Sequence, residues 1–282
     1  MLLLVVIVLF TYFLAVWMLF CELLFNDISR RGEWRIPGLV GLLAHGGYHF
    51  LVVLGNAGAV DMHFFSVLSM TFFVMSGLTI LFSTHVGMGT VGVVVFPLAG
   101  LLLAVYHGYG HSPSPELGWR VELHACLALL GYATLGIAAL LAMMLWFRER
   151  ALRRRNVHHW RGALPPLTEL EKLLFRAITF GFILLTFTVF TGFLFVRDFL
   201  EQKLLHKSVL SVLSWVIFGG LLIGRWRYGW RGIKAVHWTL TAMMFLVLAF
   251  FGSKLMIELM LRHQSSSVSP VRHASYGEQG LR

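Results

Sequence analysis

The segment WRVELHACLALLGYA, residues 119–133, decides the fold of this chain. A polar loop ends in this segment and a long apolar run begins, with His124 at the junction. The segment LLHKSV, residues 204–209, repeats the arrangement, with His206 at the junction. Two histidines at equivalent depths on two membrane helices could face one another across a small gap. That is the geometry that a planar metal cofactor such as haem requires.

The amino-acid composition is that of a membrane protein. Of the 282 residues, 58% are hydrophobic and only 13% are charged, whereas soluble domains carry about 25% charged residues. The apolar residues form repeated runs of roughly 20 residues, which is the length that crosses a bilayer as a helix. Because the runs are continuous and do not alternate, they favour helices over the strands of a membrane barrel. The sequence therefore predicts an all-α, polytopic membrane helix bundle.

About eight transmembrane helices are predicted, in a single domain over residues 1–262. The first run lacks a basic start and a small-residue cleavage site, so we expect a first span and not a cleaved signal. Thr168 and Glu171 predict a capping box at the start of the sixth span. The serine-rich residues 263–282 are predicted to be a disordered tail. The predicted spans are 2–24, 36–55, 62–82, 88–106, 121–147, 170–196, 205–224 and 234–260.

The basic residues predict the orientation of the bundle. Arginine and lysine gather in the odd-numbered loops, above all in residues 148–161 and 225–234. Because cytoplasmic loops are enriched in these residues, we expect the odd loops in the cytoplasm and both termini on the extracytoplasmic side. The formal net charge of +10 does not indicate a nucleic-acid partner, since the charges lie in short loops between spans.

The first candidate site is a haem site near the outer surface, with His124 and His206 as iron ligands. Arg120 and Lys207 could pair with the haem propionates, and Trp215 could form part of an apolar wall. The alternative is that both histidines are tolerated at the membrane interface, where an amphipathic ring is well placed.

The second candidate pair is His45 and His49, which share one face of the second predicted span because they are four residues apart. Ionisable groups near the middle of a membrane are costly and usually functional. The pair could ligate a second haem or relay protons. The alternative is a hydrogen-bonded pair inside the bundle.

Several segments resemble the cytochrome c assembly family of CcsA-, CcmC- and HemX-like membrane proteins. The run LHACLALLGYA, residues 123–133, resembles the first external-histidine helix of that family. The resemblance covers about residues 35–260 and is greatest to the YpjD-like subgroup. The further segments that carry it are LPPL (164–167), ELE (169–171), TG (191–192), HKSVLS (206–211), GWRG (229–232) and FGSK (251–254).

The resemblance implies a role in handling haem. In the haem-handling members, a tryptophan-rich external segment binds the haem face and two external histidines ligate the iron. By resemblance, His124 takes the place of the first histidine. The chain departs from the pattern because its sixth loop has no tryptophan, and residues 225–227 are Arg-Trp-Arg where the second histidine would stand. His206 instead lies near the place of the missing segment.

These observations predict a multi-pass protein of the bacterial inner membrane that holds haem at its external face. We expect it to act with other cytochrome c assembly proteins in the lipid bilayer and not as an autonomous enzyme, because no catalytic triad order or phosphate-binding loop is present. One alternative is a b-type electron carrier with a second haem near His45 and His49. Another is a transporter or accessory protein without haem.

Overall fold

The structure is a computed structural model of the chain. For residues 24–25, 202–207 and 251–267, the structure describes the backbone but not the side chains. The residues that it describes are 1–25, 32–56, 60–62, 64–84, 88–110, 118–153, 166–195 and 202–267.

The described residues form eight α-helices and no β-strand. Each helix is long and apolar enough to cross a bilayer, so the predicted all-α membrane bundle is confirmed. The predicted tail from 263 onward overlaps the end of the last helix, and residues 268–282 lie outside the described part of the chain. The helices are α1 (Leu2–Phe25), α2 (Arg35–Gly55), α3 (Phe64–Leu81), α4 (Met88–Tyr109), α5 (Trp119–Arg153), α6 (Leu167–Phe195), α7 (Gln202–Tyr228) and α8 (Ile233–Ser267).

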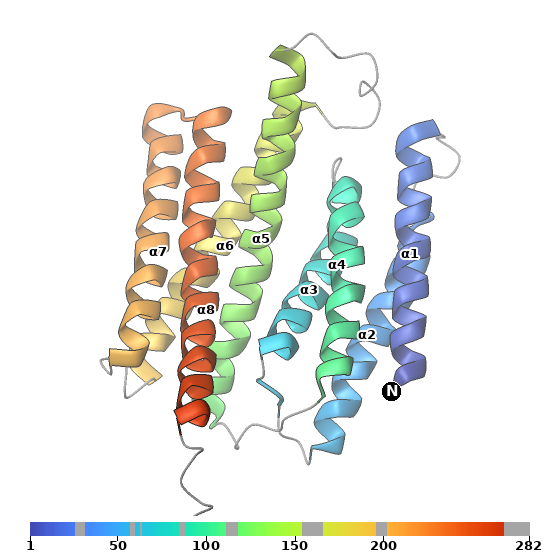
Figure 1. Cartoon of the computed structure of the whole chain (residues 1–282). Helices are drawn as coiled ribbons and strands as arrows, with labels where there is room; N and C mark the ends of the chain where they lie inside the picture. Colours follow the sequence, from blue (N-terminus) through green and yellow to red (C-terminus); the bar gives the residue numbers. More distant parts are fainter. Residues whose placement is uncertain are drawn as a thin grey trace, which may run out of the picture.

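The helices pack as two groups that follow the order of the chain (Figure 1). In the first group, α1 packs against α2 and α4, and α3 also packs against α2 and α4. In the second group, α6 and α8 each pack against both α5 and α7. The groups meet where α3 packs against α5. A Cβ on Gly136 of α5 would lie 3.3 Å from the Met75 sulfur of α3, so the small residue allows the two helices to approach closely here.

The outer surface of the bundle is apolar. Large side chains such as Phe10, Phe13, Leu43, Phe180 and Phe193 are exposed on several helices. A soluble monomer rarely exposes apolar area on this scale. In a bilayer these side chains contact lipid tails, and the helices satisfy their own backbone hydrogen bonds.

The short connection between α7 and α8 contains the GWRG segment. Gly229 and Gly232 have φ angles of +65° and +55°, which glycine adopts without steric cost. The Trp230 ring packs directly on Gly224, and the Trp230 amide donates to the Gly224 carbonyl at 3.2 Å. This turn therefore holds α7 and α8 together as an antiparallel pair.

The predicted capping box at Thr168 and Glu171 is wrong. The helix α6 begins at Leu167, so Thr168 already lies inside it. The Glu171 carboxylate instead accepts a hydrogen bond from the Gly232 amide at 2.8 Å, and it lies 3.5 Å from Nε of Arg231. Glu171 thus satisfies an amide at the start of α8, where a negative charge is favourable.

One end of the bundle holds the starts of the odd-numbered helices and the ends of the even-numbered helices (Figure 1). It is the lower end in Figure 1, and we call it the lower end. The basic residues Arg35, Arg148 and Arg225 belong to the opposite, upper end. If the charge rule holds for this chain, the lower end faces away from the cytoplasm.

Reporter fusions should reveal this orientation. A phosphatase that is active only outside the cytoplasm should be active when fused after Ser114 and inactive when fused after Arg154. A reporter that is active only in the cytoplasm should give the reverse pattern at the same two positions. Inverted results at both positions would refute the orientation and place His124 on the cytoplasmic side.

Candidate functional site

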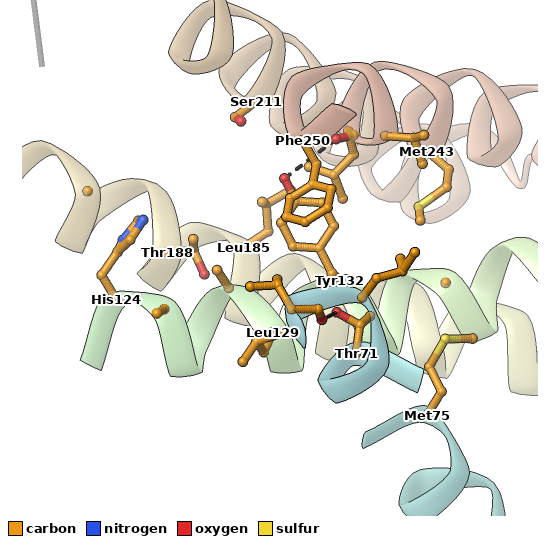
Figure 2. A pocket seen from close by; sticks show the side chains of 18 of the residues that line it. Thr71, Met75, His124, Leu129, Tyr132, Leu185, Thr188, Ser211, Met243 and Phe250 are labelled. Atoms are coloured by element: carbon orange, nitrogen blue, oxygen red, sulfur yellow. Dashed lines mark hydrogen bonds between the residues drawn. The ribbon is translucent and has the colours of Figure 1, made fainter. Parts of the chain in front are cut away.

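A cavity of about 570 Å³ lies among α3, α5, α6, α7 and α8 (Figure 2). Its volume falls in the range of roughly 300–1,000 Å³ that is usual for small-molecule and cofactor sites. Most of its wall is aliphatic or aromatic. The polar side chains in the lining are Thr71, His124, Tyr132, Thr188, Ser208 and Ser211.

His124 lies at one end of this cavity, and Met75 and Met243 lie at the other (Figure 2). The second turn of α5 carries His124, which is half-buried. Tyr132 lies between these ends, and its ring is 5.7 Å from that of Phe250 on α8. The arrangement gives a long apolar chamber with an imidazole at its lower end.

A hydrogen bond to α6 orients the His124 ring. Nδ1 of His124 lies 3.1 Å from the Thr191 hydroxyl, which donates its own proton to the Phe187 carbonyl at 2.8 Å. Thr191 has a single hydroxyl proton, so while it donates that proton to the carbonyl, Nδ1 of His124 is the donor in the bond between them. The neutral ring then has its unprotonated nitrogen at Nε2, which is the atom that can ligate a metal.

Gly192 leaves the space in which the His124 ring lies. A Cβ at this position would be 3.0 Å from Cε1 of His124 and 3.5 Å from its Nδ1. Any side chain at 192 would therefore press on the ring. The adjacent residues Thr191 and Gly192 thus have complementary roles, because one orients the imidazole and the other makes room for it.

Arg120 lies one turn before His124, on the exposed surface of α5. Its guanidinium is 5.6 Å from the Trp119 ring centre and 5.9 Å from that of Phe195 on α6. Arg120 is not part of the cavity lining, although its neighbour Val121 is. A cation stacked in this way at the lower end stays accessible to an anionic group.

The other predicted residues of this site are on α7. His206 and Lys207 belong to its first turns, but their side chains lie outside the described residues, so the pairing of His206 with His124 stays a prediction. The nearby Ser208 and Ser211 line the cavity. Since α6 and α8 pack against both α5 and α7, α5 and α7 stand diagonally across it.

Trp215 does not line the cavity. Its indole Nε1 donates to the Thr186 hydroxyl at 2.9 Å, and its ring stacks on Phe182 at 5.7 Å. Both partners are on α6. Trp215 therefore fills the contact between α6 and α7.

His45 and His49 lie in the other half of the molecule and do not reach the cavity. Both are buried, and Nε2 of each lies close to the Ser69 hydroxyl of α3, at 3.0 Å and 3.1 Å. Their rings stack with centres 5.3 Å apart. This geometry favours a hydrogen-bonded pair over ligation of a second haem, because both Nε2 atoms converge on one hydroxyl group.

The partners of this pair were not foreseen from the sequence. The signal for them is a run of small polar residues on one face of α3, which are Ser66, Ser69, Ser76 and Thr79, all fully buried. Spacings of three, seven and three residues keep them on one side of a helix. In the described part of the chain, no group of three or more His, Cys, Asp or Glu residues could hold a metal ion.

Comparison with known proteins identifies the family. The family profile described as cytochrome C assembly protein matches residues 33–261. The chain belongs to the cytochrome C assembly protein family. This result confirms the predicted resemblance, and the match includes α2–α7, α8 as far as residue 261, and the whole cavity.

Three relatives show how the similarity is distributed within the family. The inner membrane protein YpjD of Escherichia coli strain K12 is 28% identical over 240 residues, 82% of this chain and 90% of that protein. The cytochrome c biogenesis protein CcsA of Prochlorococcus marinus is 26% identical over 165 residues, which are 50% and 52% of the two chains. Protein HemX of Brevibacillus brevis is 25% identical over 131 residues, 46% and 48% of the two chains. No solved structure matches the chain.

Proposed function

We propose that this member of the cytochrome C assembly family is a multi-pass inner-membrane protein that binds haem in the cavity, with His124 as an iron ligand. The observation that carries the proposal is the hydrogen bond between His124 and Thr191. It directs the proton to Nδ1 and leaves Nε2 as the basic nitrogen, which is the arrangement that supports metal ligation by histidine. The cavity wall is mostly apolar, as a porphyrin requires.

Each residue has a distinct task in this proposal. His124 would bind the iron, Thr191 orients the His124 ring, and Gly192 leaves room for that ring. Arg120 would pair with a propionate at the lower end, with Lys207 as a second cation on α7. His206 is the proposed second ligand, and Trp215 supports the contact between α6 and α7. When bound, haem would supply an iron centre whose reactivity depends on its axial ligands.

The proposed role is to hold haem at the external face for other cytochrome c assembly proteins. Support comes from the family match and from the likeness to a cytochrome c biogenesis protein. Such a protein positions a cofactor, and the chemistry belongs to the cofactor. The proposal therefore includes no autonomous catalysis by this chain.

Haem titration of the purified protein in lipid nanodiscs tests this function. We expect a saturable Soret band with a fixed stoichiometry of haem to protein. The absence of a saturable band would contradict haem binding and favour a transporter or accessory role without haem. Reversible redox bands from two haems per chain would favour the b-type electron carrier.

Thr191→Val should weaken haem binding without unfolding the protein. The substitution keeps the shape of the side chain but removes the hydroxyl that holds His124, and loss of such a supporting group costs about 10- to 100-fold in metal affinity. Thr179→Val is the control, because the Thr179 hydroxyl bonds to its own helix, at the Phe175 carbonyl. Equal affinities for the two variants in the haem titration would argue against an orienting role for Thr191.

A further inference from the structure

A chain of buried polar side chains runs through the first group of helices, away from the cavity. It joins Tyr12 of α1, His45 and His49 of α2, and Ser69 of α3, each of which is 7% exposed or less. Nε2 of His45 and Nε2 of His49 lie 3.0 Å and 3.1 Å from the Ser69 hydroxyl. Nδ1 of His45 lies 3.5 Å from the Tyr12 hydroxyl. Polar groups in the interior of a membrane bundle are costly and commonly mark proton paths.

The single hydroxyl proton of Ser69 constrains which ring nitrogens of His45 and His49 carry protons. The hydroxyl has one proton, so it can donate to only one of the two Nε2 atoms. The other Nε2 must carry a proton and donate it to the Ser69 oxygen. When both rings are neutral and both bonds to Ser69 are made, His45 and His49 are therefore opposite tautomers.

Two further hydrogen-bonded pairs lie between this chain and the lower end of the bundle, and they contact it through their rings. The Tyr106 hydroxyl donates to the Asp61 carboxylate at 2.9 Å, and the Tyr48 hydroxyl lies 2.9 Å from Nδ1 of His107. The rings of Tyr106 and Tyr48 contact His49, with centres 5.5 Å and 6.0 Å from its ring centre. Asp61 precedes α3, and His107 is in the last turn of α4. His49 is thus the point where the deep pair meets the side chains that reach the lower end.

We propose that His49, Ser69 and His45 form a proton relay inside the first group of helices, in which Ser69 passes protons between the two imidazoles. A proton that reaches Nδ1 of neutral His49 converts that ring to imidazolium. His49 then releases the proton on Nε2 to the Ser69 oxygen while Ser69 passes its own proton to Nε2 of His45. The O–H bond of Ser69 is broken and remade, His49 becomes neutral, and His45 becomes the imidazolium. One proton is moved, and no other reactant is consumed.

Aromatic and titratable groups from the neighbouring helices surround the pair. The Tyr12 hydroxyl lies beside Nδ1 of His45, and Phe73 of α3 packs against the His45 ring with centres 5.4 Å apart. On the other side, Asp61 and His107 supply the titratable groups at the lower end. The relay is independent of the haem proposal, since none of its members lines the cavity that contains His124.

Solid-state NMR of the full chain in lipid bilayers, labelled with ¹⁵N-histidine, tests the relay. Ring nitrogens of the two neutral tautomers have separate resonances, and His45→Leu and His49→Leu assign them by loss of signal. We expect opposite tautomers for the two rings near neutral pH. On acidification we expect one shared proton, with exchange between the rings. Identical, static tautomers in the wild-type protein would overturn the proposal without the need for any variant.

Ser69→Ala should slow proton exchange between the two rings at least tenfold, because it removes the hydroxyl that lies within hydrogen-bond distance of both Nε2 atoms. Ser69→Thr keeps the hydroxyl and should retain the exchange. Ser214→Ala is the matched control, because Ser214 is an equally buried serine whose hydroxyl donates to Ala242 in the other half of the molecule. Unchanged exchange in Ser69→Ala would refute the relay, as would equal slowing in Ser214→Ala.

Discussion

Replacing His124 by alanine should reduce haem affinity more than any other single change in the cavity. The variant would lose the proposed iron ligand itself, so the loss should exceed the roughly 10- to 100-fold cost of removing a supporting hydrogen bond. The remaining wall is mostly apolar and would hold a porphyrin without fixing its iron. Haem titration in nanodiscs, read from the Soret band, measures the effect.

His237→Ala is a suitable control for this experiment. His237 is an exposed histidine near the start of α8, at the upper end of the bundle and outside the cavity lining. Its removal should leave haem affinity unchanged. An equal affinity for His124→Ala and the wild-type protein would remove His124 from the site. His206→Ala, measured in the same series, separates a site with two histidine ligands from a site with one.

Among glycine-to-alanine substitutions at the contact between α5 and α6, Gly181→Ala should lower the stability of the protein most. The new Cβ would lie 2.5 Å from Cδ2 and 2.6 Å from Cγ of Leu135, a fully buried side chain, and 3.4 Å from its backbone nitrogen. Neither atom of Leu135 can move far in a packed interior, and overpacking of this kind costs about 1–3 kcal/mol. Thermal unfolding in detergent, followed by circular dichroism, should show a lower midpoint.

Gly47→Ala provides the opposite expectation on α2. No atom lies within 4 Å of a Cβ built at Gly47, so the substitution adds no clash. Replacing glycine by alanine inside a helix is favourable by about 1 kcal/mol, so this variant should be at least as stable as the wild-type protein. Equal unfolding temperatures for Gly181→Ala and Gly47→Ala would contradict the close packing of α5 against α6 at Gly181.

The number and type of the helices could be predicted because a bilayer constrains a sequence strongly. Each span needs a continuous apolar run of sufficient length, and such runs can be counted directly. The helix ends were less predictable. The helix α5 continues to Arg153, beyond the predicted end at 147, and its last turns are stabilised by an ion pair of 2.8 Å between Glu149 and Arg153. Helices can extend into water where charged pairs four residues apart support them.

The candidate residues could be predicted by position, but their partners could not. His124 stands out because it begins an apolar run, and His45 and His49 stand out because histidine is rare at that depth. Nothing in the sequence indicated that Thr191 would orient His124 or that one serine would bridge two histidines. A serine or threonine inside a membrane helix usually bonds to its own backbone, as Thr79 does.

The sequence by itself determined the eight membrane helices and the resemblance to a family, because both depend on the order and spacing of residues along one chain. It also placed His45 and His49 on one face, since a spacing of four residues has this consequence in any helix. Only the tertiary structure decided which helices surround the cavity and which hydroxyl groups contact which imidazoles. Those contacts join residues 20 to 67 positions apart, and they depend on how closely helices approach at positions such as Gly181 and Gly192. Packing between helices depends on how their surfaces fit together in three dimensions, so it cannot be predicted from a local sequence pattern.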